Sequence, residues 1–131
     1  MSDSFIIDTN FILRYLLADN IEQSQETKIF FKNVKSGIAN AILEQAVFTE
    51  VVFVLLSFYK VSRKEIYNTL NNLLLYKGLK AYNKEVMIKA LDIFNNTNLH
   101  IVDCIVIAKA RNNNYGLKSF DNKLQKIFEQ L

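Results

Sequence analysis

The chain has 131 residues, a length that fits one domain able to bury a core without disulfide bonds or structural metals. Half of the residues are hydrophobic and 22% are charged, which excludes a disordered chain. A single cysteine, Cys104, excludes an internal disulfide. The most apolar run, residues 46–59, is interrupted by Glu50, and the N-terminus lacks the basic start of a signal peptide. We therefore expect a cytoplasmic protein with no membrane span.

Three glycines and an apolar start mark the expected strands. Gly37, Gly78 and Gly116 each follow a helical pattern and precede a short apolar run. Glycine readily takes the left-handed conformation that ends a helix, so each glycine predicts a helix stop followed by a strand. With the run at the start of the chain, the expected strands cover residues 5–7, 38–43, 79–82 and 117–120.

Helical patterns fill the stretches between these strands. They cover about residues 9–18, 21–35, 45–59, 62–76, 83–95 and 101–113, with a short helix after Asp121. Asp19 or Asn20 is placed to cap the second helix, and residues 62–65 form a capping box for the fourth. Because every connection between strands is helical, the strands must be parallel, with right-handed crossovers. The sequence predicts one α/β domain over residues 1–131, a three-layer α/β/α sandwich with about four parallel strands and helices on both faces of the sheet.

Four of the 13 carboxylates stand in positions that are unusual for surface acids. Asp8 and Asp121 directly follow the first and last predicted strands, and Asp103 falls in the first turn of its helix. Glu50 lies within the apolar helix, on a valine stripe that we expect to face the core. Ligands of such sheets bind beyond the carboxyl ends of the strands, and four converging carboxylates would repel one another without a cation. All-oxygen ligands favour Mg²⁺ or Mn²⁺.

Each acid taken alone has a simpler interpretation. Asp8 and Asp121 are suitable helix caps, and Asp103 suits the positive end of a helix dipole. Glu44 ends the second predicted strand, so it either joins the site or begins the next helix. Glu50 is the hardest to explain structurally, because a glutamate among apolar side chains has few structural roles.

The charge distribution suits a polyanionic partner. The net charge is +3, and setting the four acids aside leaves 9 acidic against 16 basic residues, a charge of +7. A basic exterior around an acidic pocket would steer a nucleic acid towards a metal. Ordinary solvated lysines on helix faces explain the same composition. His100 is the only histidine, which excludes a ribonuclease mechanism that uses two histidines.

Four short runs occur in order along nearly the whole chain, and each contains one of the four acids. They are Phe5-Ile6-Ile7-Asp8-Thr9-Asn10, Thr49-Glu50-Val51-Val52-Phe53-Val54-Leu55, Val102-Asp103-Cys104-Ile105-Val106 and Ser119-Phe120-Asp121-Asn122-Lys123-Leu124. With this order and spacing the chain resembles the PIN-domain family. More narrowly, it resembles the VapC-type ribonuclease toxins of bacterial toxin–antitoxin pairs.

The resemblance implies a metal-dependent endoribonuclease that uses Mg²⁺ or Mn²⁺. The acids that it maps onto the metal and catalytic site are Asp8, Glu50, Asp103 and Asp121, and the supporting polar residues are Thr9, Asn10 and Ser119. It also implies a homodimer, an RNA substrate and a small antitoxin protein that inserts a segment near the active site. Lys109, Arg111 and Lys123 are our candidates for phosphate contacts.

The sequence departs from the family pattern in two places. Glu44-Gln45 stands where small or short polar residues are more usual, which could alter metal occupancy or antitoxin fit. The chain also ends soon after Asp121, so we expect the family's common fifth strand to be missing or very short.

Three other classes of protein share parts of the pattern. A phosphotransfer receiver needs an acidic pair at the first strand and single helices between strands, and a haloacid-dehalogenase-like phosphatase needs an aspartate where this chain has Asn10. The rival of another kind is a non-catalytic PIN-like module that binds RNA or protein. Binding alone does not require acids at all four positions, which favours the nuclease.

Overall fold

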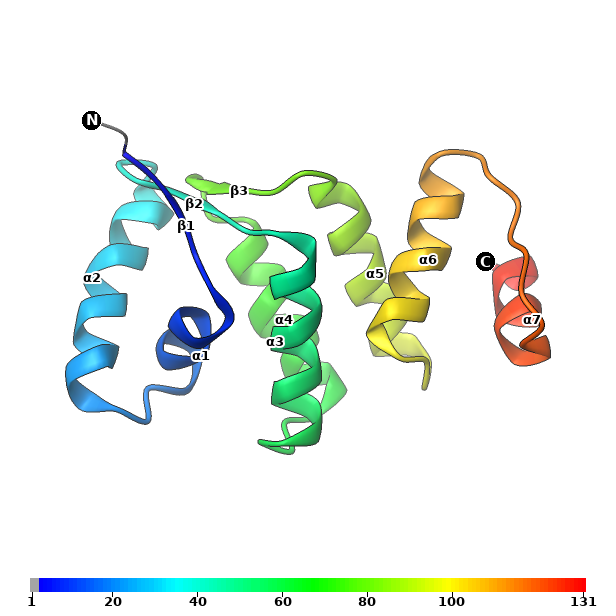
Figure 1. The fold of residues 1–131 in the computed structure, drawn as a ribbon, viewed down its shortest axis with the longest axis horizontal. Coiled ribbons are helices and arrows are strands. Elements are labelled where there is room, and N and C mark those ends of the chain that lie inside the picture. The colour runs from blue at the N-terminus through cyan, green and yellow to red at the C-terminus, as the bar shows by residue number, and fades with distance from the viewer. Residues whose placement is uncertain (1–2) are drawn as a thin grey trace. The chain divides into compact units, whose positions relative to one another are not determined.

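The computed structural model describes residues 3–131, in which helices accompany a small parallel sheet (Figure 1). The contacts divide the chain into two compact units, Met1–Lys84 and Glu85–Leu131. The elements in chain order are β1 (Ser4–Ile6), α1 (Thr9–Leu17), α2 (Ile21–Ser36), β2 (Asn40–Ile42), α3 (Gln45–Ser57), α4 (Arg63–Leu74), β3 (Leu79–Lys80), α5 (Lys84–Asn96), α6 (Ile101–Asn112) and α7 (Asn122–Gln130). Among the described residues no helix is long and apolar enough to cross a membrane. The prediction of one domain stays a prediction.

The sheet belongs to the first unit and has the order β1-β2-β3, with both pairs parallel. The register aligns Phe5 with Ala41 and Leu79 in one row across the strands. Ala41 and Leu79 are fully buried and face the core, whereas Phe5 on the edge strand is 50% exposed. The next row faces the opposite side, because side chains alternate along a strand. The predicted α/β class and the parallel pairing are confirmed, and they are consistent with a PIN-like α/β/α sandwich.

Capping side chains and buried apolar stripes determine where the helices of the first unit begin and which side of each faces the core. The Asn20 side chain accepts a hydrogen bond from the Gln23 amide at 3.0 Å, and the Ser62 hydroxyl accepts one from the Glu65 amide at 3.2 Å. Gly37 ends α2 in the left-handed conformation, with φ of 86°. The core of this unit includes Phe31, Val34, Phe48, Val51, Ile66, Leu70 and Leu73. Each such side chain contributes about 1.5–3 kcal/mol by leaving water.

The second unit consists of the remaining helices. α5 buries Met87, Leu91 and Phe94, and α6 buries Cys104 and Ile107. The helices predicted over 83–95, 101–113 and after Asp121 are all confirmed within one or two residues.

The predicted strand over 117–120 is wrong, since these residues form no strand in the structure. Local side chains bond this segment instead: the Leu117 carbonyl accepts from Gln125 Nε2 at 3.3 Å, and Ser119 Oγ accepts from the Asp121 amide at 3.0 Å. Gly116 is not the helix stop either. Asn114 takes the left-handed conformation after α6, with φ of 60°, and asparagine tolerates it. The described residues thus contain three strands rather than about four.

Gly78 acts through close approach of backbones rather than through a left-handed turn. Its amide donates to the Val34 carbonyl at 2.7 Å, and its carbonyl accepts from the Ala41 amide at 2.9 Å. A Cβ at this position would lie 2.0 Å from the Ala39 carbonyl oxygen and 2.8 Å from that of Val34. The glycine therefore allows the loop before β3 to pack against the segment that leads into β2.

We expect Gly78→Ala to lower the free energy of unfolding by about 1–3 kcal/mol or more, because backbone atoms must move to admit the methyl group. Urea denaturation of the purified protein measures the change. Gly116→Ala is the matched control, since its Cβ would meet nothing within 4 Å, and its effect should stay within about 0.5 kcal/mol. Equal stability of the two variants would contradict the close approach.

Candidate active site

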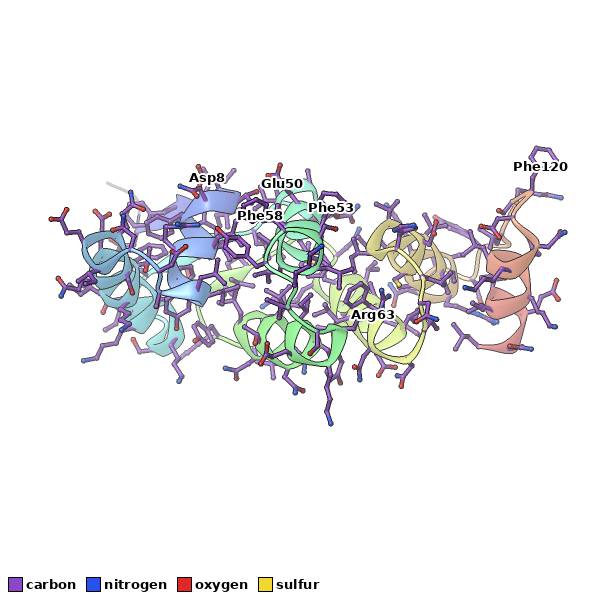
Figure 2. The ribbon with its side chains drawn as sticks, turned by 90° about the horizontal axis from the view of Figure 1, so that it is seen from below. Asp8, Glu50, Phe53, Phe58, Arg63 and Phe120 are labelled. Carbon is purple, nitrogen blue, oxygen red and sulfur yellow. The ribbon has the colours of Figure 1, made fainter. Side chains whose placement is uncertain are left out.

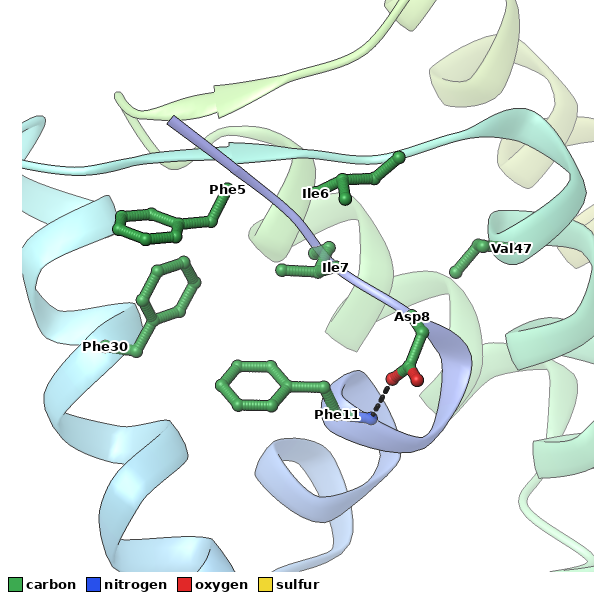
Figure 3. A pocket seen from close by; sticks show the side chains of 7 residues that line it. All are labelled: Phe5, Ile6, Ile7, Asp8, Phe11, Phe30 and Val47. Carbon is green, nitrogen blue, oxygen red and sulfur yellow. Dashed lines mark hydrogen bonds between the residues drawn. The ribbon is translucent and has the colours of Figure 1, made fainter. Parts of the chain in front are cut away.

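Asp8 stands at the carboxyl end of β1, one residue beyond Ile7, and caps α1. Its Oδ1 accepts a hydrogen bond from the Phe11 amide at 2.8 Å (Figure 3). The side chain is exposed to solvent. A carboxylate has about four acceptor sites, so the cap leaves Asp8 with the capacity to bind a cation or a water.

Glu50 lies on the exposed side of α3, and the prediction that it faces the core is wrong. The helix buries Phe48, Val51, Val52 and Leu55. At 100° per residue these four side chains form one stripe, and Glu50 falls on the opposite side. The valines beside it at 47 and 54 are only half-buried. The Glu50 carboxylate therefore stays in contact with water and needs no buried partner. It is accessible to a ligand.

Thr9 joins the two acids of the first unit. Its Oγ1 donates a hydrogen bond to Glu50 Oε1, although 41 residues separate them. Thr9 directly follows Asp8, so this bond holds the Glu50 carboxylate beside the start of α1. Figure 2 shows the two acids on the same side of the first unit, on neighbouring helices. Asn10, the other predicted polar residue of this motif, is exposed in the first turn of α1 and lines a pocket of about 220 Å³ together with Asp8 and Arg14.

The two acids of the second unit both lie at helix starts. Asp103 is half-buried in the first turn of α6. Asp121 caps α7, its Oδ1 accepting from the amides of Lys123 at 3.0 Å and Leu124 at 3.1 Å. Ser119 Oγ accepts from the Asp121 backbone amide at 3.0 Å, so it contacts the main chain of Asp121.

The structure pairs Thr9 with Glu50 in the first unit and Ser119 with Asp121 in the second. In the part of the chain that the structure describes, no three acidic, histidine or cysteine side chains are grouped to hold a metal ion. The donors themselves fit a hard cation, because Asp8 and Glu50 are solvent-accessible carboxylates with unused oxygen lone pairs. Oxygen ligands of this kind favour Mg²⁺ or Mn²⁺ over zinc.

An apolar pocket of about 610 Å³ adjoins Asp8 at the outer edge of β1 (Figure 3). Its lining residues are Phe5, Ile6, Ile7, Asp8, Phe11, Phe30 and Val47. Edge-to-face contacts of the Phe30 ring with Phe5 at 5.7 Å and with Phe11 at 5.4 Å form one wall. Sequence reasoning missed this pocket, because a strand next to the first acid was expected to be covered on both faces.

The basic side chains of the four motifs and of the predicted phosphate contacts divide into structural and accessible ones. Arg14 pairs with Asp19 at 2.9 Å and donates to the Tyr59 hydroxyl at 3.2 Å, which ties α1 to the end of α3. In the second unit Arg111 donates to the Phe128 carbonyl and lies 4.5 Å from the centre of the Phe128 ring. Its guanidinium therefore stabilises the packing of α6 and α7. Lys109 and Lys123, the other proposed phosphate contacts, are exposed.

One of the comparisons with known proteins identifies a family for this chain. The family model for the PIN domain matches residues 5–129, which is nearly the whole chain. No curated protein and no solved structure matches the chain. PIN domains are generally nucleases, and such nucleases commonly use divalent metal ions. Because the match covers nearly the whole chain, this chain belongs to the PIN-domain family and has a fold of the nuclease type.

Proposed function

We propose that this protein is a metal-dependent endoribonuclease and the toxin of a bacterial toxin–antitoxin system. The observation that carries the proposal is the pair of carboxylates of the first unit. Asp8 stands at the carboxyl end of a parallel strand, and Thr9 holds Glu50 beside it. In a chain of this family, such acids provide the start of a site for a hard divalent cation.

The proposed ligands of one or two Mg²⁺ or Mn²⁺ ions are Asp8, Glu50, Asp103 and Asp121. When bound, the ion lowers the pKa of a water and stabilises negative charge on the RNA phosphodiester. Asp8 presents one carboxylate oxygen to the Phe11 amide and keeps the other for the site. Thr9 holds Glu50, Ser119 supports the turn at Asp121, and Asn10 orients water near Asp8.

The apolar pocket supports regulation by a small antitoxin protein. Its walls are mostly aromatic and aliphatic, which suits the side chains of a protein segment better than a phosphate backbone. A segment seated there would lie directly against Asp8. Occupation of this pocket would therefore block access of RNA to the acid, as an inhibitor of the enzyme must.

Exposed aromatic side chains on the first unit support a homodimer. Phe53 on α3 is 60% exposed, and Phe58 at the end of that helix is 75% exposed (Figure 2). Aromatic residues are enriched in the cores of protein interfaces, and large exposed ones favour association.

One observation favours the second candidate, a non-catalytic module that binds RNA or protein. Asp8 and Asp121 both cap helices, so each has a structural role that does not require catalysis. Cleavage assays on variants that keep the caps separate the two functions.

Asp8→Asn should abolish Mg²⁺- or Mn²⁺-dependent cleavage of a mixed RNA pool, because it removes the charge that binds the cation. Asparagine caps helices about as well as aspartate, so the fold should persist. The matched control is Asp3→Asn, at the opposite end of β1, which should cut RNA like the unaltered protein. EDTA should stop cleavage by the control and by the unaltered protein. A well-folded protein that cuts no RNA with either metal but still binds it would support the binding module instead.

Thr9→Val should lower kcat/KM for RNA cleavage by about 10-fold or more, because Glu50 loses the donor that positions it. Thr9→Ser restores the hydroxyl and should recover most of the activity. Thr49→Val removes a neighbouring hydroxyl that donates to the Gln45 carbonyl within α3, and is the control. The metal concentration needed for half-maximal activity should rise for Thr9→Val alone. Unchanged metal dependence in Thr9→Val would remove Thr9 from the site.

A further inference from the structure

Two lysines lie together at the carboxyl end of β3. Lys80 is the last residue of β3, and Lys84 is the first residue of α5. Both line a pocket of about 340 Å³ whose other lining residues are Ile42, Leu79, Ala81 and Tyr82. All of these residues belong to the first unit.

The two ammonium groups are only partly satisfied by the protein. Lys84 Nζ donates to the Leu79 carbonyl at 2.5 Å, and Lys80 Nζ donates to the Lys77 carbonyl at 3.5 Å. An ammonium has three donors, so each retains N–H groups for another partner. Within the described residues neither lysine forms an ion pair with an acid. Burial and the nearby charge of Lys80 both lower the pKa of Lys84, and an anion between the two groups would relieve this repulsion.

The register places this lysine pair on the same edge of the sheet as the proposed metal site. Ile6, Ile42 and Lys80 are aligned across the three strands. Asp8 follows two residues beyond Ile6, and Glu44 two residues beyond Ile42. Since neighbouring strands are about 4.8 Å apart, Lys80 is roughly 10 Å across the sheet from β1. Glu44 is exposed after β2, between β1 and β3. Its negative charge would repel anions there, so anions would be attracted to the lysines at the end of β3.

Tyr82 adds an aromatic surface to the lysine pair. It follows Lys80 by two residues and is 88% exposed. A free aromatic face next to cationic side chains is the combination that single-stranded nucleic acids use, because bases stack on the ring while phosphates contact the cations.

We propose that Lys80, Lys84 and Tyr82 form a binding site for single-stranded RNA. The lysines contact a backbone phosphate, and Tyr82 stacks on an adjoining base. In the proposed nuclease, on which the substrate assignment rests, the contacted phosphate is a neighbour of the one that is cut. A strand bound across the carboxyl edge of the sheet would run from Asp8 towards Lys80.

The test is the salt dependence of binding to a labelled single-stranded RNA, measured in EDTA so that no metal-dependent cleavage occurs. Removing each phosphate contact should make the slope of log K against log salt shallower by about 0.7. The main variant is Lys80→Gln/Lys84→Gln. A second variant, Lys80→Gln alone, keeps the hydrogen bond from Lys84 to the Leu79 carbonyl. Lys28→Gln/Lys64→Gln is the charge-matched control, since both of these lysines are exposed on helices of the first unit.

A shallower slope in the Lys80 variants but not in the control supports the site. Tyr82→Ala should weaken binding by about 5-fold or more, and Tyr82→Phe should not. The same slope in all proteins, an equal change in the control, or no salt-dependent binding by the unaltered protein would overturn the site. Cleavage in Mg²⁺ is measured separately. If the unaltered protein cuts RNA but the Lys80 variants show no change in slope, only the lysine site is overturned. If the slope changes but the unaltered protein cuts no RNA, only the proposed nuclease activity is overturned.

Discussion

The parallel register of three very short strands determines where the side chains of the first unit lie. β1 and β2 have three residues each and β3 has two, so few backbone bonds define the alignment. The buried row of Ala41 and Leu79 makes a slip costly, because a shift by one residue would turn these side chains to the opposite face. The close approach of the Gly78 backbone to Ala39 and Val34 supports the same strand register, although Gly78 lies just before β3. As a result, the residues beyond each strand meet at one edge.

Local patterns predicted the elements of this protein well, and long-range geometry less well. Capping residues such as Asn20 and Ser62 marked helix starts correctly, because a cap acts within four residues. The error at Glu50 arose because valines surround it in sequence, whereas the buried stripe of α3 is centred on Phe48 and Val52. The error at residues 117–120 has another cause. A strand requires a partner, and an apolar run beside a glycine does not show whether one is present.

The sequence also identified the candidate acids without resolving their roles. Asp8 and Asp121 occupy positions that serve a helix start and a ligand site equally well, since a capping carboxylate keeps lone pairs for a second partner. Structure adds what spacing could not show, the bond from Thr9 to Glu50 between residues far apart in the chain. Such a contact depends on how α1 and α3 pack, and no pattern within either helix encodes it. The pocket beside Asp8 was missed because the strand next to it was expected to be covered on both faces.

The edge of the sheet separates opposite charges along its length. Acidic side chains follow β1 and β2, whereas lysines accompany the end of β3. A purely acidic edge would bind a cation but repel the phosphates that a nuclease must hold, and a purely basic edge would bind RNA without retaining a metal. In the proposed site, Asp8 and the lysines stand two strands apart, roughly 10 Å across the sheet, which would allow both. If the proposed lysine and metal sites both operate, this charge separation would orient a polyanion as well as attract it, because phosphate would bind at the lysine end of the edge without a metal.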